Sequence, residues 1–560
     1  MASVSITRLG FGSANAKIVM EHQFISYSGH RADEWQKGGS SLVSLSWAHD
    51  TTSLIGMMLR EIAYSLAGLV LLAYAVEWAL SLFDDAREPR RLQSKVPLVG
   101  HLLGMIQHGA AYYGMTSKTT DAEVYTLNIF HTKLYVTKTQ RLTPSIQKAA
   151  RTLSFRPFMQ TAAKLMGDAS AKTYDIFGSD FIDDFSHSMK TSLAPGAYLD
   201  EQNLRMGKRA MQDVDALSSL EKPAIFLHEW VKHTVVQASS CGLYGEVHPY
   251  LDQAVEDAFW TWQSYLPLQM VGLDLRGKAK AARQIVFDAY KKYCDSLPND
   301  VSQLIRERSR TMREAGVSEE DICKQEATFG TAAFANTVPA LYWSIYELFS
   351  RPDVLEEVRA QIAEQAITGA KESGFVVDVA ALKTKCPLLL SVYQETQRTR
   401  HIHANIRKVT ADTLLDERYL LKAGNYVQMP GQPIHTNPDI WGSSADTFDP
   451  YRFAKTDADR KSVSPSSFLA WGAPPHLCPA RQFATTEILI VIALLAMKYD
   501  LTPKATGMWE RNPQLNIGDM VSVYLPKKDV ELEVKEREAW SGTWSLEMGE
   551  SKTRISLASG

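Results

Sequence analysis

The sequence has few cysteines and no excess of charge of either sign. Its 560 residues include five cysteines, which are widely spaced and form no CxxC pair. A disulfide framework is therefore not expected, and this cysteine usage favours a reducing compartment. The formal net charge of −3 gives no support for a nucleic-acid partner. The sequence shows no internal repeat and no flavin or nicotinamide fingerprint in a strand–turn–helix context.

Long hydrophobic runs are also scarce, with one exception at residues 62–83. These 22 residues carry a single charge, Glu77, and are long enough to cross a bilayer as one helix. Basic residues are concentrated just after the run, between Arg87 and Lys95. By the positive-inside rule, this end of the helix faces the cytosol. Glu77 keeps a second interpretation open, in which the run is a buried amphipathic helix of a soluble domain.

The rest of the chain has an ordinary globular composition, 45% hydrophobic and 22% charged. Residues 125–130 and 133–137 alternate between apolar and polar side chains across a short polar turn, which predicts a β-hairpin. From about residue 140 to 370 the pattern is mainly helical, and short strands return after residue 400. With no βαβ alternation, we predict a mainly α fold with small β-sheets.

Cys478 lies in the loop that carries most information about function. The loop contains Trp471, a Gly/Pro-rich turn and His476, and it ends where a small residue and Arg481 open a helix. A helix N-terminus stabilises a thiolate through its dipole and free N–H groups. Taken alone, a cysteine in such a turn is more often a buried free thiol.

The loop resembles the haem-thiolate loop of the cytochrome P450 family. The resemblance implies that Cys478 is the axial ligand of haem b iron and that His476 and Trp471 lie at the haem. The family places an arginine at the position of Arg407, which is therefore a candidate propionate partner. Its Trp-x-x-x-Arg haem contact has no clear counterpart, since Arg205 and Lys208 lie in the corresponding helix but lack the tryptophan.

Two further stretches resemble this family in the expected order. Glu395 and Arg398 form its Glu-x-x-Arg motif, in which the spacing puts both charges on one helix face. Arg452 lies in a Pro-x-Arg-Phe motif. The resemblance implies a structural triad of Glu395, Arg398 and Arg452 that braces the haem-side core. The alternative is a surface ion pair of little energetic weight.

A predicted helix from Ser318 to about Ser350 lies where the family has its oxygen-binding helix. Pro339 should distort this helix beside Asn336 and Thr337, because proline has no N–H and clashes with the carbonyl four residues earlier. The two residues are the candidate catalytic pair. Asn336 cannot titrate, so protons would come through water and the Thr337 hydroxyl. This stretch and residues 478–484 most resemble the branch of cholesterol 7α-hydroxylase and prostacyclin synthase.

Other residues suggest the character of the substrate pocket. Residues 155–166 and 520–524 are apolar, which favours a bulky lipophilic substrate. His401 and His403 would share one face of a strand, so a metal pair is conceivable, but no third ligand is evident. The family resemblance makes this segment a pocket wall instead.

The resemblance covers about residues 90–535 and divides the chain into four parts. We expect residues 1–55 to be a disordered or lumenal extension and residues 56–84 a transmembrane anchor. Residues 85–540 form the cytochrome P450 catalytic domain, and 541–560 form a flexible tail. The expected location is the endoplasmic reticulum membrane, with a single pass and a cytosolic catalytic domain.

The implied function is a haem-thiolate monooxygenase that oxidises a terpenoid, steroid or related secondary metabolite with O2. Electrons would come from NADPH through a separate cytochrome P450 reductase, with cytochrome b5 as a second candidate donor. One alternative is a haem isomerase or dehydratase that converts a peroxide substrate without external electrons, as Asn336 suggests. Another is a non-catalytic haem-binding protein.

Overall fold

The computed structural model describes residues 43–560 except 271, 455–462, 517–521 and 550–551. It divides into two units, Met1–Val70 and Leu71–Gly560. Helix α1, Val43–Ser81, begins in the first unit. The predicted extension therefore ends earlier than expected, because residues 43–55 are already helical, while residues 1–42 lie outside the described residues. Within α1, Gly56–Ser81 is long and apolar enough to cross a membrane, and its most apolar window is not buried.

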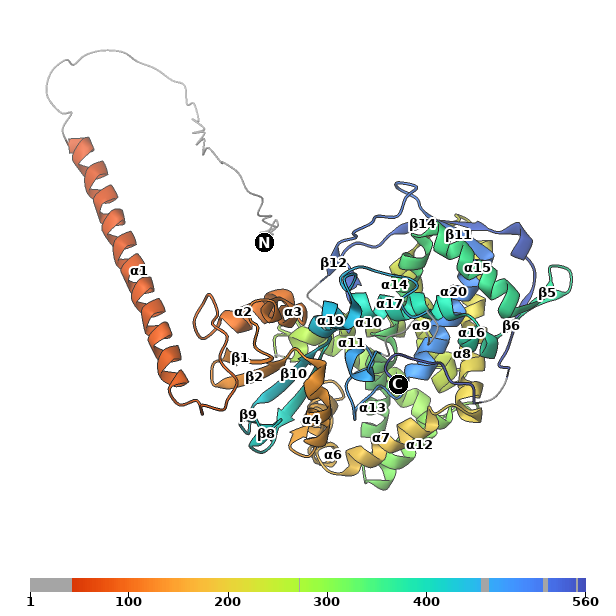
Figure 1. Ribbon diagram of the computed structural model, residues 1–560, viewed down its shortest axis with the longest axis horizontal. Helices are drawn as coiled ribbons and strands as arrows, with labels where there is room; N and C mark the ends of the chain where they lie inside the picture. Colours follow the sequence, from red (N-terminus) through yellow and green to blue (C-terminus); the bar gives the residue numbers. More distant parts are fainter. Residues whose placement is uncertain (1–42, 271, 455–462, 517–521, 550–551) are drawn as a thin grey trace, which may run out of the picture. The chain divides into compact units, whose positions relative to one another are not determined.

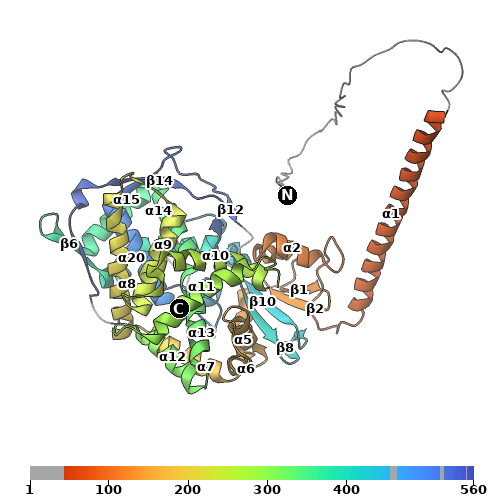
Figure 2. The same cartoon turned by 180° about the vertical axis from the view of Figure 1, so that it is seen from behind.

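The Leu71–Gly560 unit combines a helical part with small sheets, as predicted (Figures 1 and 2). Its helices from the amino-terminal side to the middle of the chain are α2 Gly100–His108, α3 Ala111–Ser117, α4 Thr143–Lys148, α5 Arg156–Leu165, α6 Ala171–Phe177, α7 Phe181–Ser192, α8 Ala197–Asp215, α9 Leu227–Tyr244, α10 Gln253–Met270, α11 Lys278–Asp295 and α12 Gln303–Glu314. The later helices are α13 Glu319–Phe334, α14 Thr337–Phe349, α15 Pro352–Gln365, α16 Val379–Thr384, α17 Pro387–Arg400, α18 Gly431–His435, α19 Pro438–Trp441 and α20 Arg481–Lys498.

The largest sheet has five strands in the order β1-β2-β10-β7-β3. Its strands are β1 Val124–Ile129, β2 Thr132–Thr137, β3 Leu153–Ser154, β7 Ala404–Val409 and β10 Tyr426–Pro430. The predicted hairpin is confirmed, since β1 and β2 pair antiparallel across residues 130 and 131. Strand β10 pairs parallel with β2 and antiparallel with β7, so the segment after residue 400 joins the hairpin in one sheet.

Four smaller sheets occur among the described residues. Their strands are β4 Ala224–Phe226, β5 Ile367–Ala370, β6 Gly374–Asp378, β8 Thr413–Leu415, β9 Tyr419–Leu421, β11 Tyr499–Pro503, β12 Leu515–Asn516, β13 Leu525–Pro526, β14 Glu531–Glu536 and β15 Trp544–Glu547. The predicted strand at residues 520–524 is reduced to an isolated bridge between Val523 and His401, and residues 520 and 521 lie outside the described residues.

Helix α20 is at the centre of the helical part. Nearly all its side chains are buried, and it packs against α8 and α14. A helix that is apolar on every face requires neighbours all round, which explains its run from Ile488 to Leu495. The same core fixes the loop before α20, because the helix starts only three residues after Cys478.

The predicted oxygen-binding helix is interrupted where Pro339 led us to expect it. Ser318 caps α13 by accepting a hydrogen bond from the Asp321 N–H at 3.2 Å. The helix ends at Phe334 and α14 begins at Thr337, leaving Ala335 and Asn336 as a turn between them. Proline at 339 cannot donate to the Ala335 carbonyl, so the regular bonding of one continuous helix is lost there.

The prediction of a flexible tail at residues 541–560 is wrong. Strand β15 pairs parallel with β6, and Trp544 packs beside Phe375 and Trp540. Further along, Ile555 is fully buried in the main core. The Ser/Gly/Thr-rich composition was misleading, because the few apolar side chains of this segment are all that packing requires.

Candidate functional site

One cavity of about 350 Å³ brings together the candidate residues from distant parts of the sequence. It lies between the α13–α14 turn, β7, the loop before α20 and the first turns of α20. The predicted residues that line it are Cys478, His476, Trp471, Arg407, Asn336 and Thr337. Apolar side chains make up much of the remaining wall, among them Leu193, Leu243, Leu304, Phe329, Phe483 and Val523.

The Cys478 loop is held by backbone hydrogen bonds. The Cys478 N–H donates to the Trp471 carbonyl oxygen at 2.8 Å, and Arg481 Nη1 donates to the Cys478 carbonyl oxygen at 3.2 Å. Gly472 has φ +96°, and a Cβ there would lie 2.9 Å from the His476 carbonyl oxygen, so the turn requires glycine. The loop thus directs Cys478 into the cavity at the start of a helix.

Two opposing effects act on the pKa of the Cys478 thiol. Burial raises its pKa, while a hydrogen bond from the Ala480 N–H and the charge of Arg481 lower it. The first and larger effect keeps a buried thiol neutral, and the second is the stabilisation that a helix start gives to a thiolate. An iron cation would supply the missing positive charge, so the site has the chemistry of a thiolate metal ligand.

Arg407 on β7 is a buried guanidinium that lacks an anion. It is 3% exposed and donates to the carbonyl oxygens of Ile406 at 2.8 Å and Ala473 at 3.1 Å. No carboxylate of the described residues lies within ion-pair distance. Burial lowers the pKa of Arg407 to about 10. Because an unpaired buried charge is costly, an anionic group in the cavity would stabilise Arg407, and a haem propionate would suit this position.

His476 and Trp471 complete the rim of the cavity around Arg407. Burial, followed by the charges of Arg407 and Lys190, lowers the pKa of His476 to about 4. The ring is therefore neutral near pH 7 and can donate one hydrogen bond. The Trp471 Nε1 donor is buried and has no partner among the described residues, so it too is available to a bound group.

Sequence reasoning missed Lys190 on α7. This lysine and His476 line a second hollow of about 660 Å³ beside the Cys478 loop. Arg205, the residue considered from the sequence, instead lies on α8 and donates to the Gly242 carbonyl oxygen at 3.2 Å. It does not line the 350 Å³ cavity. No sequence signal identified Lys190, because Ser186 and Lys190 do not match the Trp-x-x-x-Arg motif.

The candidate catalytic pair lies where the helix is interrupted, and each of the two side chains has different hydrogen-bond partners. Thr337 Oγ1 donates to the Ala333 carbonyl oxygen at 3.1 Å. Asn336 Oδ1 accepts from both the N–H and the hydroxyl of Ser522, each at 2.9 Å. A backbone N–H can only donate, so the amide oxygen of Asn336 must face Ser522 and its NH2 group is left for other partners. Ser522 was not anticipated as a partner.

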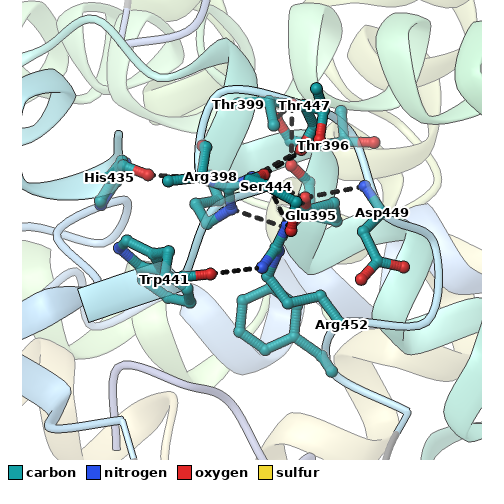
Figure 3. A network of polar contacts seen from close by, with 12 residues as sticks. Glu395, Thr396, Arg398, Thr399, His435, Trp441, Ser444, Thr447, Asp449 and Arg452 are labelled. Carbon is teal, nitrogen blue, oxygen red and sulfur yellow. Dashed lines mark hydrogen bonds and ion pairs between the residues drawn. The ribbon is translucent and has the colours of Figure 1, made fainter. Parts of the chain in front are cut away.

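Glu395, Arg398 and Arg452 form the predicted triad (Figure 3). Arg398 donates two hydrogen bonds to the Glu395 carboxylate, both 2.7 Å, and Arg452 Nε donates to Glu395 Oε1 at 3.0 Å. The Glu395 side chain is fully buried and Arg398 is 1% exposed. Arg398 also donates to three backbone carbonyls, those of His435, Ala445 and Thr447. The surface-pair alternative is therefore excluded.

The two histidines of the HxH pair do not build a metal site. No cluster of three or more potential ligands occurs among the described residues. His401 is buried, and burial together with His435 and His403 lowers its pKa well below the usual value. His403 lines the cavity, in agreement with the pocket-wall interpretation.

The two predicted pocket segments contribute less than expected. Of residues 155–166, only Phe155 is among the lining residues, because the rest form α5, which packs against α6. From the second segment, Ser522 and Val523 line the cavity.

Comparison with known proteins agrees with this arrangement. The family model Cytochrome P450 matches residues 255–533. A cytochrome P450 monooxygenase of Hypoxylon pulicicidum, nodJ, is 29% identical over 90% of this chain and 100% of its own length. A cytochrome P450 monooxygenase of Gibberella zeae is 24% identical over 88% of this chain and 97% of its own. The crystal structure of the cytochrome P450DA haem domain shares the fold, with a TM-score of 0.61 and 18% identity over 81% of this chain and 97% of that one.

Fold, site and relatives together define a haem-thiolate protein, and the chain belongs to the cytochrome P450 superfamily. It is a cytochrome P450 monooxygenase whose haem iron is held by a cysteine thiolate. Enzymes of this class act on lipophilic substrates and receive electrons from redox partners.

Proposed function

We propose that Cys478 is the thiolate ligand and that this enzyme hydroxylates or otherwise oxidises a bulky lipophilic substrate. The proposal rests on one observation: Cys478 and Arg407, a buried guanidinium without a carboxylate partner among the described residues, line the same cavity. A haem with a thiolate ligand supplies the activation of O2, because the sulfur donates electron density that favours O–O cleavage. Arg407, His476, Trp471 and Lys190 would hold and orient the haem edge.

A terpenoid, steroid or related secondary metabolite fits the cavity wall best. Leucine, phenylalanine and alanine contribute much of the wall, and apolar surfaces with few polar groups favour lipophilic ligands. The fungal relatives named as monooxygenases are consistent with secondary metabolism. Incubating purified protein with a reductase, NADPH and a panel of such lipids, followed by product analysis, tests the proposal. Absence of any oxygenated product from these classes would contradict it.

We infer from Asn336 and Thr337 a likeness to the branch of cholesterol 7α-hydroxylase and prostacyclin synthase. That branch includes both a hydroxylase and an isomerase. The Asn336–Thr337 pair by itself is therefore compatible with either reaction. We favour the monooxygenase, because both full-length relatives carry that name. The second candidate, an isomerase of peroxide substrates, rests on Asn336, whose amide cannot deliver a proton as a carboxylic acid does.

Replacing Thr337 with alanine separates these two reactions. In a monooxygenase the Thr337 hydroxyl and nearby water are the available proton relay. The variant is then expected to keep consuming NADPH while product falls and H2O2 rises. An isomerase would turn over anaerobically without reductase and show no peroxide in the variant.

Ser344→Ala is the matched control for Thr337→Ala. Ser344 makes the same kind of bond on α14, to the Ala340 carbonyl oxygen at 2.7 Å, but it is fully buried and does not line the cavity. The Ser344→Ala variant is expected to form as much product per NADPH consumed as the parent enzyme. Equal H2O2 release from both variants would argue against a relay role for Thr337.

We further propose that α1 anchors the enzyme in the endoplasmic reticulum membrane with its catalytic domain in the cytosol. The unburied apolar window supports an anchor rather than a core helix. NADPH–cytochrome P450 reductase is then the expected electron donor, with cytochrome b5 as an additional one. The non-catalytic alternative is disfavoured by the apolar cavity and by the relatives' monooxygenase activity.

Deleting residues 1–82 is expected to release the catalytic domain from membranes. The deletion removes the apolar span but keeps Asp84, which accepts a bond from Lys133 Nζ at 2.6 Å. Membrane fractionation after carbonate washing, with the full chain as control, measures the effect. Carbonate-resistant association of the shortened protein would mean that another segment is embedded.

A further inference from the structure

Residues 552–560 lie against the Cys478 loop as a half-buried segment outside any helix or strand, which ends in a turn at residues 557–560. Ile555, Leu557 and Ser559 are buried, while the side chains between them are partly or fully exposed. This alternation is typical of a strand with one face on a core. The segment pairs with no strand among the described residues, so its buried backbone groups need other hydrogen-bond partners.

Two buried glutamines provide these partners. Gln482 Nε2 donates to the Ile555 carbonyl oxygen at 3.0 Å, and the Ile555 N–H donates back to Gln482 Oε1 at 2.8 Å. The Ala558 N–H donates to Gln394 Oε1 at 2.7 Å. Gln482 lies in the first turn of α20, four residues after Cys478, and Gln394 immediately precedes Glu395 on α17. The segment therefore ties the cysteine-bearing helix start to the helix of the triad.

The segment also contacts the loop directly. Arg481, whose Nη1 binds the Cys478 carbonyl oxygen, donates through Nε to the Gly560 carbonyl oxygen at 3.3 Å. Ala558 packs in the same apolar cluster as Phe468 and Trp471, which flank the turn that precedes Cys478. The segment itself lies beyond residue 533, where the match to the family model ends, while its partners lie within the match.

We propose that residues 552–560 are a positioning element that fixes the direction in which Cys478 enters the cavity. Its hydrogen bonds to Gln482 on α20 and Gln394 on α17 hold the first turn of α20 against α17, and we call this set of bonds the clamp. The clamp limits rotation of the Cys478 loop. The inference rests on the proposed role of Cys478 as haem ligand, and it assigns no catalytic step to the segment. When the clamp is lost, Cys478 is expected to disengage from iron more readily while the fold persists.

Two variants of the full-length holoenzyme test the proposal. One ends at Lys552, and the other is Gln482→Leu, which removes both bonds to Ile555 but keeps the apolar contacts of the segment. The measurement is the decay rate of the thiolate-type CO band at a temperature well below unfolding. We expect decay to be about tenfold faster in each, the rate ratio that corresponds to about 1.4 kcal/mol. If the shortened chain does not accumulate, Gln482→Leu alone decides.

Leu546→Ala is the matched control. Leu546 lies on β15 and packs toward Gly207 of α8, away from the Cys478 loop. It should lower the unfolding midpoint without changing the decay rate of the CO band. Decay at the parent rate in Gln482→Leu, or equal acceleration in Leu546→Ala, would overturn a positioning role and leave only a contribution to stability.

Amide hydrogen exchange of residues 478–486 in haem-free protein gives a readout that does not depend on the ligand. Gln482→Leu is expected to accelerate exchange there, and Leu546→Ala is not. If the parent protein shows no thiolate-type band, Cys478 is rejected as the ligand, and accelerated exchange would still establish the clamp. Unchanged exchange would reject the clamp itself.

Discussion

Cys478→Ala is expected to abolish the thiolate-type spectrum completely. Reduced parent protein with CO should absorb near ~450 nm, as thiolate ligation implies, and the variant should lose that band or lose haem. The physical reason is that Cys478 is the one cysteine lining the 350 Å³ cavity in the part of the chain that the structure describes. No other cysteine there can replace it.

Cys386→Ala is a suitable control, because Cys386 is buried at the start of α17 and does not line the cavity. Its band should be unchanged in position and in amount per haem. A retained thiolate-type band in Cys478→Ala, or its loss in Cys386→Ala alone, would contradict the assignment of the ligand.

Removing one member of the triad is expected to give the largest loss of stability. Glu395→Ala leaves Arg398 and Arg452 without their carboxylate, and breaking a buried ion pair in this way costs about 3–5 kcal/mol. Arg398→Ala should cost a similar amount, because it strands the Glu395 charge and frees three backbone carbonyls. Denaturant unfolding and the yield of haem-loaded protein measure the effect.

An exposed ion pair provides the comparison. Arg310 on α12 bonds Glu314 at 2.6 Å, but both side chains are more than half exposed. Solvent screens such pairs, so Arg310→Ala is expected to change the unfolding free energy by less than about 1 kcal/mol. If Glu395→Ala is no more harmful than Arg310→Ala, the triad does not brace the core.

The helix boundary at the catalytic pair was predictable because its cause is local. Pro339 lacks an N–H whatever surrounds it, and Ser318 can cap a helix through its own hydroxyl. Both effects act within a few residues, and the structure shows α13 and α14 separated at Ala335 and Asn336. The β1–β2 hairpin was predictable for the same reason, because apolar and polar side chains alternate on both sides of a short turn.

The partners of Asn336 and Arg407 could not be predicted in this way. Ser522 is 186 residues from Asn336, and Ala473 is 66 residues from Arg407. Nothing in the local sequence around either residue determines which distant backbone approaches it. The same holds for Lys190, which lines one hollow together with Pro475 and His476 although they are far apart in the sequence.

The sequence by itself predicted which residues carry the proposed chemistry, and the tertiary structure decided which distant residues support them. Cys478, Thr337 and the Glu395–Arg398 pair are recognisable because each motif fits within one turn or one helix. The described residues of 541–560 show the opposite case, since their composition predicts a loose tail, whereas Ile555 is buried in the main core and Ile555 and Ala558 bond Gln482 and Gln394. Burial and hydrogen bonding depend on which surfaces meet, and that is settled only when distant segments have folded against one another.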